Sequence, residues 1–549
     1  MENLNLYKMK KISLLIALVA VILSSCSKSV QDAEKVITSV DLGKHISILA
    51  SDDFGGRKPF SENEKKTLDY IQGEMEKIGL EPVFENGSYR QAVPLVEIDG
   101  KPSAILKIRG KKSFDFKLIE DYAAQSQTTA KDVSLKNLDM VFVGYGINAP
   151  EFGWNDYEGI DVKGKAVVCL VNDPGFLTQN PKHFGGNAMT YYGRWTYKYE
   201  EAARQGAKAV FIVHRTDMAG YPWGVPRRMS ESSMFCIDEP ARMNSCCDIE
   251  GWFHRDAANK LFKSLGYDLE SIWTEACNKE FKSFEMKTNA SVSTTKTFKH
   301  DKSYNIAGKI TGTEKPDEAI IYMAHWDHLG QKDTPEGKYI YNGASDNAAG
   351  VAWVLEIAKA FKQMPAPKRT VIFINPTVEE EGLQGSYYFV DHSPIPMDKV
   401  VCGINTDVLP FVGEFNDITI TGHGHSTLDD ILSEEAVKDS RYVAADPTPE
   451  NGMFFRSDHF PYMKKGVPCL FAKGMQDNKK NGKEWMPKFM DNYWKTVYHK
   501  NLDTYNPETA DLSGIVADAK MIFRFGYKIA DSDVWPKWNK TSAFAGLRK

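Results

Sequence analysis

Carboxylate and imidazole side chains follow several apolar segments in the second half of this chain of 549 residues. They are His325, Asp327, Asp346, Glu379, Glu380, Asp407 and, further downstream, His499. Apolar segments of this kind are expected to be buried, and a buried carboxylate is costly unless a cation or another partner neutralises it. Imidazole and carboxylate ligands without thiolates suit a borderline cation such as zinc. The pattern therefore predicts a metal site built from these side chains.

The elements that must position these side chains alternate between strand and helix. Short apolar runs predict strands at 319–323, 371–375, 400–404 and 468–471, and the run at 349–361 predicts a helix. Such alternation is typical of an α/β sheet covered by helices on both faces. Active sites in these sheets gather at the carboxyl ends of strands, which is where the acidic and histidine residues lie.

Six short motifs in this half of the chain resemble those of a known family. They are AHWDHLG (324–330), GASDNAAG (343–350), EEEGLQGS (379–386), INTD (404–407), RSDHFP (456–461) and YH (498–499). Together they resemble the M28 metallopeptidases, and LASDDFGGR (49–57) resembles the N-terminal part of that catalytic domain. The resemblance implies a phosphorylase/hydrolase-like α/β/α sandwich with a mixed, mostly parallel sheet. It also implies an aminopeptidase in which two Zn²⁺ ions share one site.

The resemblance assigns a role to each metal-ligating residue. It implies that His325 and Asp407 bind one zinc, that Glu380 and His499 bind the other, and that Asp346 bridges the two. Five side chains serving two ions leave positions for a water and for the substrate, as a catalytic site requires. Asp327 is expected to return to the far nitrogen of the His325 imidazole and to fix its orientation.

Glu379 is expected to be the general base. It neighbours a ligand without being one, and the family places base and ligand three and two residues before a glycine, here Gly382. Glu381 is then a bystander. Tyr498 resembles the tyrosine with which some members stabilise the tetrahedral oxyanion. Asn347 follows Asp346 at a position where the family often has a cis peptide bond.

Several further residues are weaker candidates. Arg456, Ser457 and Asp458 are expected near the substrate, with Ser457, Asp458 and His459 in positioning roles. Phe455 lines the pocket for the first substrate side chain or, as we favour, packs in the core. Trp326 is expected to be a core residue, since strand alternation points it away from the site. His328, His423 and His425 are expected to be ordinary loop residues.

The first half of the chain predicts an inserted domain. Residues 139–171 and 191–213 resemble a protease-associated (PA) domain, which gives a β-rich insert at 105–295 between a peptidase part at 26–104 and the main peptidase domain at 296–549. No acidic or histidine residue of the insert has ligand spacing. In relatives this domain lies beside the active-site cleft, so we expect it to limit substrate size.

The N-terminal segment has the pattern of a targeting signal. Residues 8–26 (KMKKISLLIALVAVILSSC) combine a basic flank with an apolar run that is too short to span a bilayer. The ending resembles a bacterial lipobox, which implies a signal peptide at 1–25, lipidation of Cys26, and a protein anchored in the cell envelope, facing the periplasm or the cell surface. Residues 27–40 are then expected to be a tether.

Composition restricts the remaining function classes. Lys and Arg number 68 against 73 Asp and Glu, which gives a net charge of −5 and no footprint for nucleic acid. Eight cysteines are too few for a disulfide scaffold, although one disulfide is plausible among Cys236, Cys246, Cys247 and Cys277.

The expected partner is a peptide that loses its N-terminal residues, and three alternatives remain. A glutamate-carboxypeptidase-like enzyme would need a basic pocket, for which Arg456 is the one arginine that the sequence places near the site. A glutaminyl cyclase is a weaker alternative, because it lacks the insert. A non-catalytic receptor relative would have a decayed site, whereas all five ligand positions and the base are intact here.

Overall fold

The computed structural model describes residues 29–335 and 337–548 of the chain. The signal peptide and Cys26 lie outside the described residues. Within these residues, no helix is both long enough and apolar enough to cross a membrane.

A mixed sheet forms the centre of the C-terminal domain. β14 (Lys315–Met323) is parallel to β17 (Arg369–Asn375) on one side and to β18 (Val400–Asn405) on the other, and β18 is parallel to β21 (Cys469–Lys473). β13 (Phe284–Ile310) is antiparallel to β17, and the short strand β1 (Glu81–Pro82) pairs antiparallel with its outer side. On the other side β19 (Asp417–Ile420) pairs antiparallel with β21 and parallel with β20 (Tyr442–Ala445). The strands begin or end a few residues away from the predicted runs.

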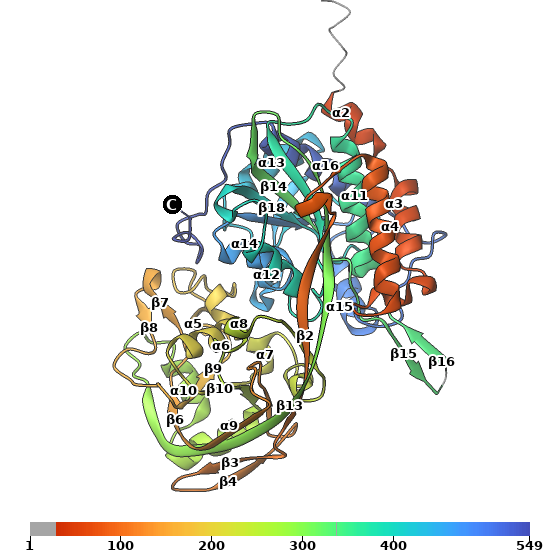
Figure 1. Cartoon of the computed structure of the whole chain (residues 1–549). Helices are drawn as coiled ribbons and strands as arrows, with labels where there is room; N and C mark the ends of the chain where they lie inside the picture. The colour runs from red at the N-terminus through yellow and green to blue at the C-terminus, as the bar shows by residue number, and fades with distance from the viewer. Residues whose placement is uncertain (1–28, 336, 549) are drawn as a thin grey trace, which may run out of the picture.

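Helices cover both faces of this sheet (Figure 1). One face packs against α3 (Ser39–Leu49), α4 (Glu62–Ile78), α11 (Ala349–Phe361), α13 (Leu428–Lys438) and α16 (Ser513–Ala530), whose apolar side chains share one core with the strands. The other face packs against α12 (Gln384–Asp391) and α14 (His459–Lys464). The predicted α/β/α fold is therefore confirmed, and α11 has the predicted bounds.

Two long strands carry the chain into the insert and back. β2 (Arg90–Pro102) pairs antiparallel with β13 over its whole length, and both run from the C-terminal domain into the insert (Figure 1). The insert has its own core, whose fully buried residues run from Leu106 to Val292. Its centre is a sheet in which β6 (Asp132–Phe142), β9 (Ala166–Leu170), β10 (Ala209–Val213) and β12 (Ile249–Phe253) are parallel in that order. Its largest helices are α6 (Trp195–Arg204), α9 (Arg255–Leu265) and α10 (Leu269–Glu275).

Two expectations about flexible or cross-linked segments are wrong. The expected tether folds onto the C-terminal domain from α2 (Val30–Ala33) onward, because Ala33 and Ile37 are fully buried and Glu34 forms an ion pair of 2.6 Å with Arg524. The disulfide considered in the insert is not formed. All seven cysteines of the described residues are free thiols.

Candidate dinuclear metal site

The carboxyl ends of the central strands bring the first group of predicted ligands together. His325 follows β14, Asp407 follows β18, and Asp346 lies in the turn that opens α11. His325 Nε2 is 3.3 Å from Asp346 Oδ1 and 3.4 Å from Asp407 Oδ1. The imidazole of His325 and the carboxylate of Asp346 are almost completely buried. The carboxyl ends of neighbouring parallel strands thus bring these side chains together, as the strand-end pattern predicted.

The second oxygen of Asp346 faces a different pair of side chains. His499 Nε2 is 3.3 Å from Asp346 Oδ2 and 2.9 Å from Glu380 Oε2. His499 follows α15 (Met486–Thr496), and Glu380 lies in the loop after β17. Asp346 therefore stands between two groups of donors, with one oxygen for each, which is the arrangement that a bridging ligand requires.

The donor set fits cations. The carboxylates of Asp327, Asp346, Glu379, Glu380 and Asp407 converge with the imidazoles of His325, His328 and His499. Burial alone would raise the pKa of Glu380, but His499 and His328 lower it to about 2. Burial would lower the pKa of His499, but Glu380 and Asp346 raise it to about 10. So many buried carboxylates need positive charge, and mixed imidazole and carboxylate oxygen donors are the ligands of catalytic zinc.

Asp327 lies beside the ligands, with a role that differs in detail from the expected one. The backbone carbonyl of Asp327, not its carboxylate, is the near partner of the His325 ring: the Nδ1–O distance is 3.1 Å, against 3.8 Å for Nδ1–Oδ1. The carboxylate instead accepts the backbone N–H groups of Glu379, at 3.1 Å, and Glu380, at 3.4 Å. A proton on Nδ1 leaves Nε2 free as a metal ligand.

Glu379 points toward the same centre. Its Oε2 lies 3.8 Å from His325 Nε2, and its side chain is about nine-tenths buried. Burial, together with the nearby carboxylates of Asp407 and Asp458, raises the pKa of Glu379 well above its usual value. The preceding residue, Val378, has a φ of 52°, a conformation that is rare for a β-branched side chain and that occurs mainly at functional sites.

His328 is a site residue that the sequence did not reveal. We expected a loop histidine, but its ring is fully buried and its Nδ1 is 2.6 Å from Glu380 Oε1. His328, Asp346 and Glu380 each present a donor atom within 4.8 Å of the others, as do His325, Asp346 and Asp407. The Nε2 atom of His328 has no hydrogen-bond partner. The one feature of the sequence that could have revealed this role is that His328 directly follows Asp327.

Two further residues hold the ligand loops. Asp503 accepts the backbone N–H groups of Ser345, at 2.9 Å, and Asp346, at 3.0 Å. Arg57 is fully buried and donates to the carbonyls of Leu49, Trp326, Asn342 and Gly343 over 2.6–2.9 Å. Arg57 ends the LASDDFGGR motif, so that motif joins the N-terminal segment to the loops of two ligands. The Asp346–Asn347 peptide bond is cis, as expected.

Tyr498 lies against the second group of donors. Its ring stacks on His499, with centroids 3.8 Å apart. Burial raises the pKa of Tyr498 well above its usual value, and the carboxylates of Asp346 and Glu380 add to the effect. Its hydroxyl group is therefore neutral and available to donate a hydrogen bond.

The RSDHFP segment surrounds the site without entering the donor groups. Ser457 Oγ accepts from Asn405 Nδ2 at 2.9 Å, and Asp458 Oδ1 accepts from Ser386 Oγ at 2.6 Å. Burial raises the pKa of Asp458 to about 6. Phe455 is 2% exposed and packs against the rings of Phe460 and Phe544, so it is a core residue rather than a substrate contact in this structure. Trp326 is fully buried, as expected.

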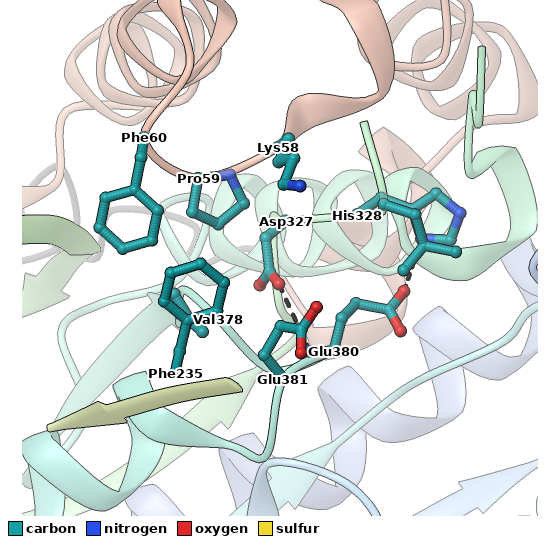
Figure 2. Close-up of a pocket in the computed structure, with 10 residues that line it drawn as sticks. Lys58, Pro59, Phe60, Phe235, Asp327, His328, Val378, Glu380 and Glu381 are labelled. Atoms are coloured by element: carbon teal, nitrogen blue, oxygen red, sulfur yellow. Dashed lines mark hydrogen bonds and ion pairs between the residues drawn. The ribbon is translucent and has the colours of Figure 1, made fainter. Parts of the chain in front are cut away.

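A pocket beside the donor groups joins three parts of the chain (Figure 2). Lys58, Pro59 and Phe60 come from the N-terminal segment and Phe235 comes from the insert. Asp327, His328, Leu329, Val378, Glu380 and Glu381 complete the lining. Glu381 is exposed, which is consistent with a residue outside the metal centre. The insert thus reaches the immediate surroundings of the site.

Comparisons of the sequence with known proteins find similarity to peptidases. Residues 305–521 match the profile of peptidase family M28. Aminopeptidase NAALADL1 of Mus musculus is 26% identical over 192 residues, which is 32% of this chain and 24% of that protein. The match thus spans about a quarter of the length of this relative. A vacuolar membrane protease of Candida dubliniensis is 32% identical over 90 residues, 16% of this chain and 9% of that protein.

Solved structures are similar over most of the chain. An aminopeptidase from Aneurinibacillus sp. strain AM-1 is 17% identical, covers 92% of this chain and 97% of its own, and has a TM-score of 0.48. The zinc aminopeptidase of Bacillus subtilis is 16% identical, covers 93% of this chain and 99% of its own, and has a TM-score of 0.41. The region matched by the family profile contains His325, Asp346, Glu379, Glu380 and Asp407. Residues 305–521 therefore carry the profile of peptidase family M28, and the predicted metal ligands lie inside this region.

Proposed function

We propose that this chain is a zinc metallopeptidase that uses two metal ions to remove N-terminal residues from peptides. The observation that carries the proposal is the carboxylate of Asp346, whose two oxygens face two different groups of donors. His325, Asp346 and Asp407 would hold one ion, and Asp346, Glu380 and His499 the other. Zinc bound there would polarise the scissile carbonyl and lower the pKa of a water molecule.

The chain's own residues would do the proton transfer and the positioning. Glu379 would accept a proton from the attacking water at Oε2 and deliver it to the nitrogen of the leaving amine. Asp327 would hold the backbone of Glu379 and fix the ring of His325 through its carbonyl. The hydroxyl of Tyr498 would donate to the oxygen on which negative charge develops.

The proposal includes the end of the peptide that is cleaved, which is the N-terminus. Its support is the M28 domain together with the aminopeptidase named among the relatives. The glutamate-carboxypeptidase-like alternative, which also needs cations that recognise a free carboxylate, is separated from this proposal by substrates with a blocked N-terminus. A non-catalytic binding protein is disfavoured because the ligand positions and Glu379 converge in the folded chain.

A substrate panel tests the proposal. Zinc-loaded protein, with its metal content measured by mass spectrometry, is assayed on aminoacyl substrates, dipeptidyl substrates and N-blocked peptides with free C-termini. We expect about two zinc ions per chain and cleavage of substrates with a free N-terminus. Cleavage of the N-blocked peptides alone would contradict the aminopeptidase assignment. A protein that holds its zinc but hydrolyses nothing would contradict the enzymatic one.

We also propose that the mature protein is anchored in a bacterial envelope through lipidated Cys26, and that the insert at 105–295 is a PA-like domain that limits substrate size. The support is the lipobox-like end of the leader for the first and the reach of Phe235 to the pocket for the second. Cys26→Ala should move the protein from the detergent phase to the aqueous phase. A folded variant without the insert should cleave larger substrates, and unchanged discrimination would contradict this role.

A further inference from the structure

Two arginines meet where the insert packs on the peptidase domain. Arg194 belongs to the insert, directly before α6, and is 8% exposed. Arg456 belongs to the peptidase domain, in the segment before α14. The guanidinium carbon of Arg456 lies 5.4 Å from the ring centroid of Tyr221, a residue of the insert. The two charges therefore come from different domains to one place.

Contacts on either side hold this place together. The backbone N–H of Met189 donates to the carbonyl of Pro449 at 3.2 Å. Asn187 Nδ2 donates to Glu450 Oε2 at 2.9 Å. The insert segment that leads to Arg194 is thus bonded to the peptidase segment that leads to Arg456. These hydrogen bonds hold Arg194 and Arg456 in place at the interface between the two domains.

Neither arginine has a carboxylate or carbonyl partner for its charge among the described residues. Nε of Arg194 and both Nε and Nη2 of Arg456 are buried without a hydrogen-bond partner, and neither guanidinium forms an ion pair. The other buried arginines of the described residues each bond to at least one carboxylate or carbonyl, although Arg369, Arg441 and Arg524 also keep one unpartnered nitrogen; they are Arg57, Arg369, Arg441 and Arg524. Unpaired buried charge is strongly destabilising, so this pair is an exception that calls for a ligand.

The electrostatics of the two arginines favour an anion beside them. Burial, with repulsion from Arg456, lowers the pKa of Arg194 to about 9. Burial likewise lowers the pKa of Arg456. The groups that oppose these shifts are phenols, namely Tyr221 for both arginines, Tyr387 for Arg194 and Tyr498 for Arg456. No carboxylate acts on either guanidinium strongly enough to offset burial.

The pair is also linked to the metal site. Tyr498 interacts with Arg456 on one side and stacks on His499 on the other. A molecule held by the arginines would therefore reach the donor groups along Tyr498. The arginines lie outside the two donor groups, so they can bind a part of the substrate that does not react.

We propose that Arg194 and Arg456 together bind a carboxylate of the substrate, either the C-terminal carboxylate of a short peptide or an acidic side chain. The proposal rests on the peptidase function proposed above and narrows it to substrates that carry this charge. Two guanidinium forks present parallel N–H donors, the geometry that carboxylates accept most strongly. Because each domain supplies one arginine, the insert takes part in substrate selection.

Matched substrates test the proposal and separate the two sources of the carboxylate. Ala-Ala is compared with Ala-Ala amide for the C-terminal carboxylate, and glutamyl p-nitroanilide with glutaminyl p-nitroanilide for the side chain. We expect kcat/KM of the wild-type protein to favour the charged member of one pair by about 10- to 100-fold, the range of one charge-assisted contact. Arg194→Ala and Arg456→Ala should each remove most of this preference and change the uncharged substrate less than about threefold.

Controls separate binding from folding and from the catalytic proposal. Arg227→Ala removes an exposed arginine of the insert and should leave the preference intact. Arg194→Lys and Arg456→Lys keep the positive charge and should retain part of the preference for the charged substrate. In Glu379→Gln protein, calorimetry with Ala-Ala and its amide measures binding without turnover, so an inactive enzyme does not mask the site. Equal affinities and equal rates within both pairs, or a uniform loss on charged and uncharged substrates in the alanine variants, would overturn the proposal.

Discussion

The backbone N–H of Glu379 donates to Asp327 Oδ1 over 3.1 Å. The other oxygen of this carboxylate accepts the N–H of Glu380, and the carbonyl of Asp327 lies 3.1 Å from His325 Nδ1. One residue thus ties the predicted base to ligands from both donor groups. Its position two residues after His325 places it where the carboxyl ends of the parallel strands β14 and β17 lie side by side.

Replacing Asp327 with Asn should uncouple these groups. The oxygen of the Asn side-chain amide can accept one of the two backbone N–H groups, but its NH₂ group then faces the other N–H group and cannot accept it. We expect a loss of about 10- to 100-fold in zinc affinity or in kcat, the usual cost of removing a group that orients metal ligands. Zinc titration and steady-state rates measure the two effects. Asp327→Ala should be worse than Asp327→Asn, and wild-type values in both variants would exclude this role.

Replacing Glu379 with Gln should leave the metals and remove the base. Gln has almost the same volume and cannot take a proton from water, so we expect zinc content to stay unchanged while kcat falls by about 10²- to 10⁴-fold. Glu381→Gln is the matched control, because it removes a carboxylate two residues away that is exposed. Near-wild-type turnover in Glu379→Gln, or an equal loss in Glu381→Gln, would assign the base elsewhere.

His328 and His499 both contact Glu380, on different oxygens. If His499 is the ligand and His328 positions Glu380, His499→Ala should reduce the zinc content by about one ion per chain. His328→Ala should retain both ions and weaken the second by about 10- to 100-fold, as expected for a partner that orients a ligand. Metal analysis after dialysis against graded chelator separates the cases. Loss of one ion in His328→Ala alone would exchange the two roles.

Among the residues near the site, replacement of Arg57 is expected to lower the free energy of unfolding most. Its guanidinium donates to four carbonyls in three segments, and removal leaves these acceptors unsatisfied in a buried place. We expect Arg57→Ala to lower the free energy of unfolding by about 3–5 kcal/mol, the cost of breaking a buried charged network. Arg57→Lys keeps the charge without the fork and should restore only a part. Urea denaturation measures both, and a loss below about 1 kcal/mol would contradict the assigned role.

The sequence allowed the strands, the side chains that meet at the strand ends and the cis peptide bond to be predicted, because each is local or carried by a motif. Polar residues directly after apolar runs predicted which side chains meet. Partners that are distant in sequence could not be predicted this way. Arg57 reaches Gly343 across 286 positions, and Arg194 meets Arg456 only because the insert folds back on the peptidase domain. His328 was missed because a single histidine in a loop has no periodicity to distinguish it.

Glu250 of the insert predicts a pH dependence of stability that does not involve the metal site. It is 2% exposed, accepts from Gln127 Nε2 at 2.8 Å, and burial raises its pKa from 4.5 to about 7. The folded state therefore binds this proton more tightly than the unfolded state does, so the stabilising contribution is complete below pH 4.5 and falls as the pH rises to about 7. Gln at this position cannot ionise and avoids that loss.

Glu250→Gln should therefore be more stable relative to wild type at pH 8 than at pH 5, by on the order of 1–3 kcal/mol. Chemical denaturation at the two pH values, followed by a probe in the insert, measures the difference between the variants. Glu280→Gln removes an exposed carboxylate of the same domain and should show no such dependence. An equal effect of Glu250→Gln at both pH values would mean that Glu250 ionises normally despite its burial. The hydrogen bond from Gln127 would then be strong enough to offset the cost of burying the charge.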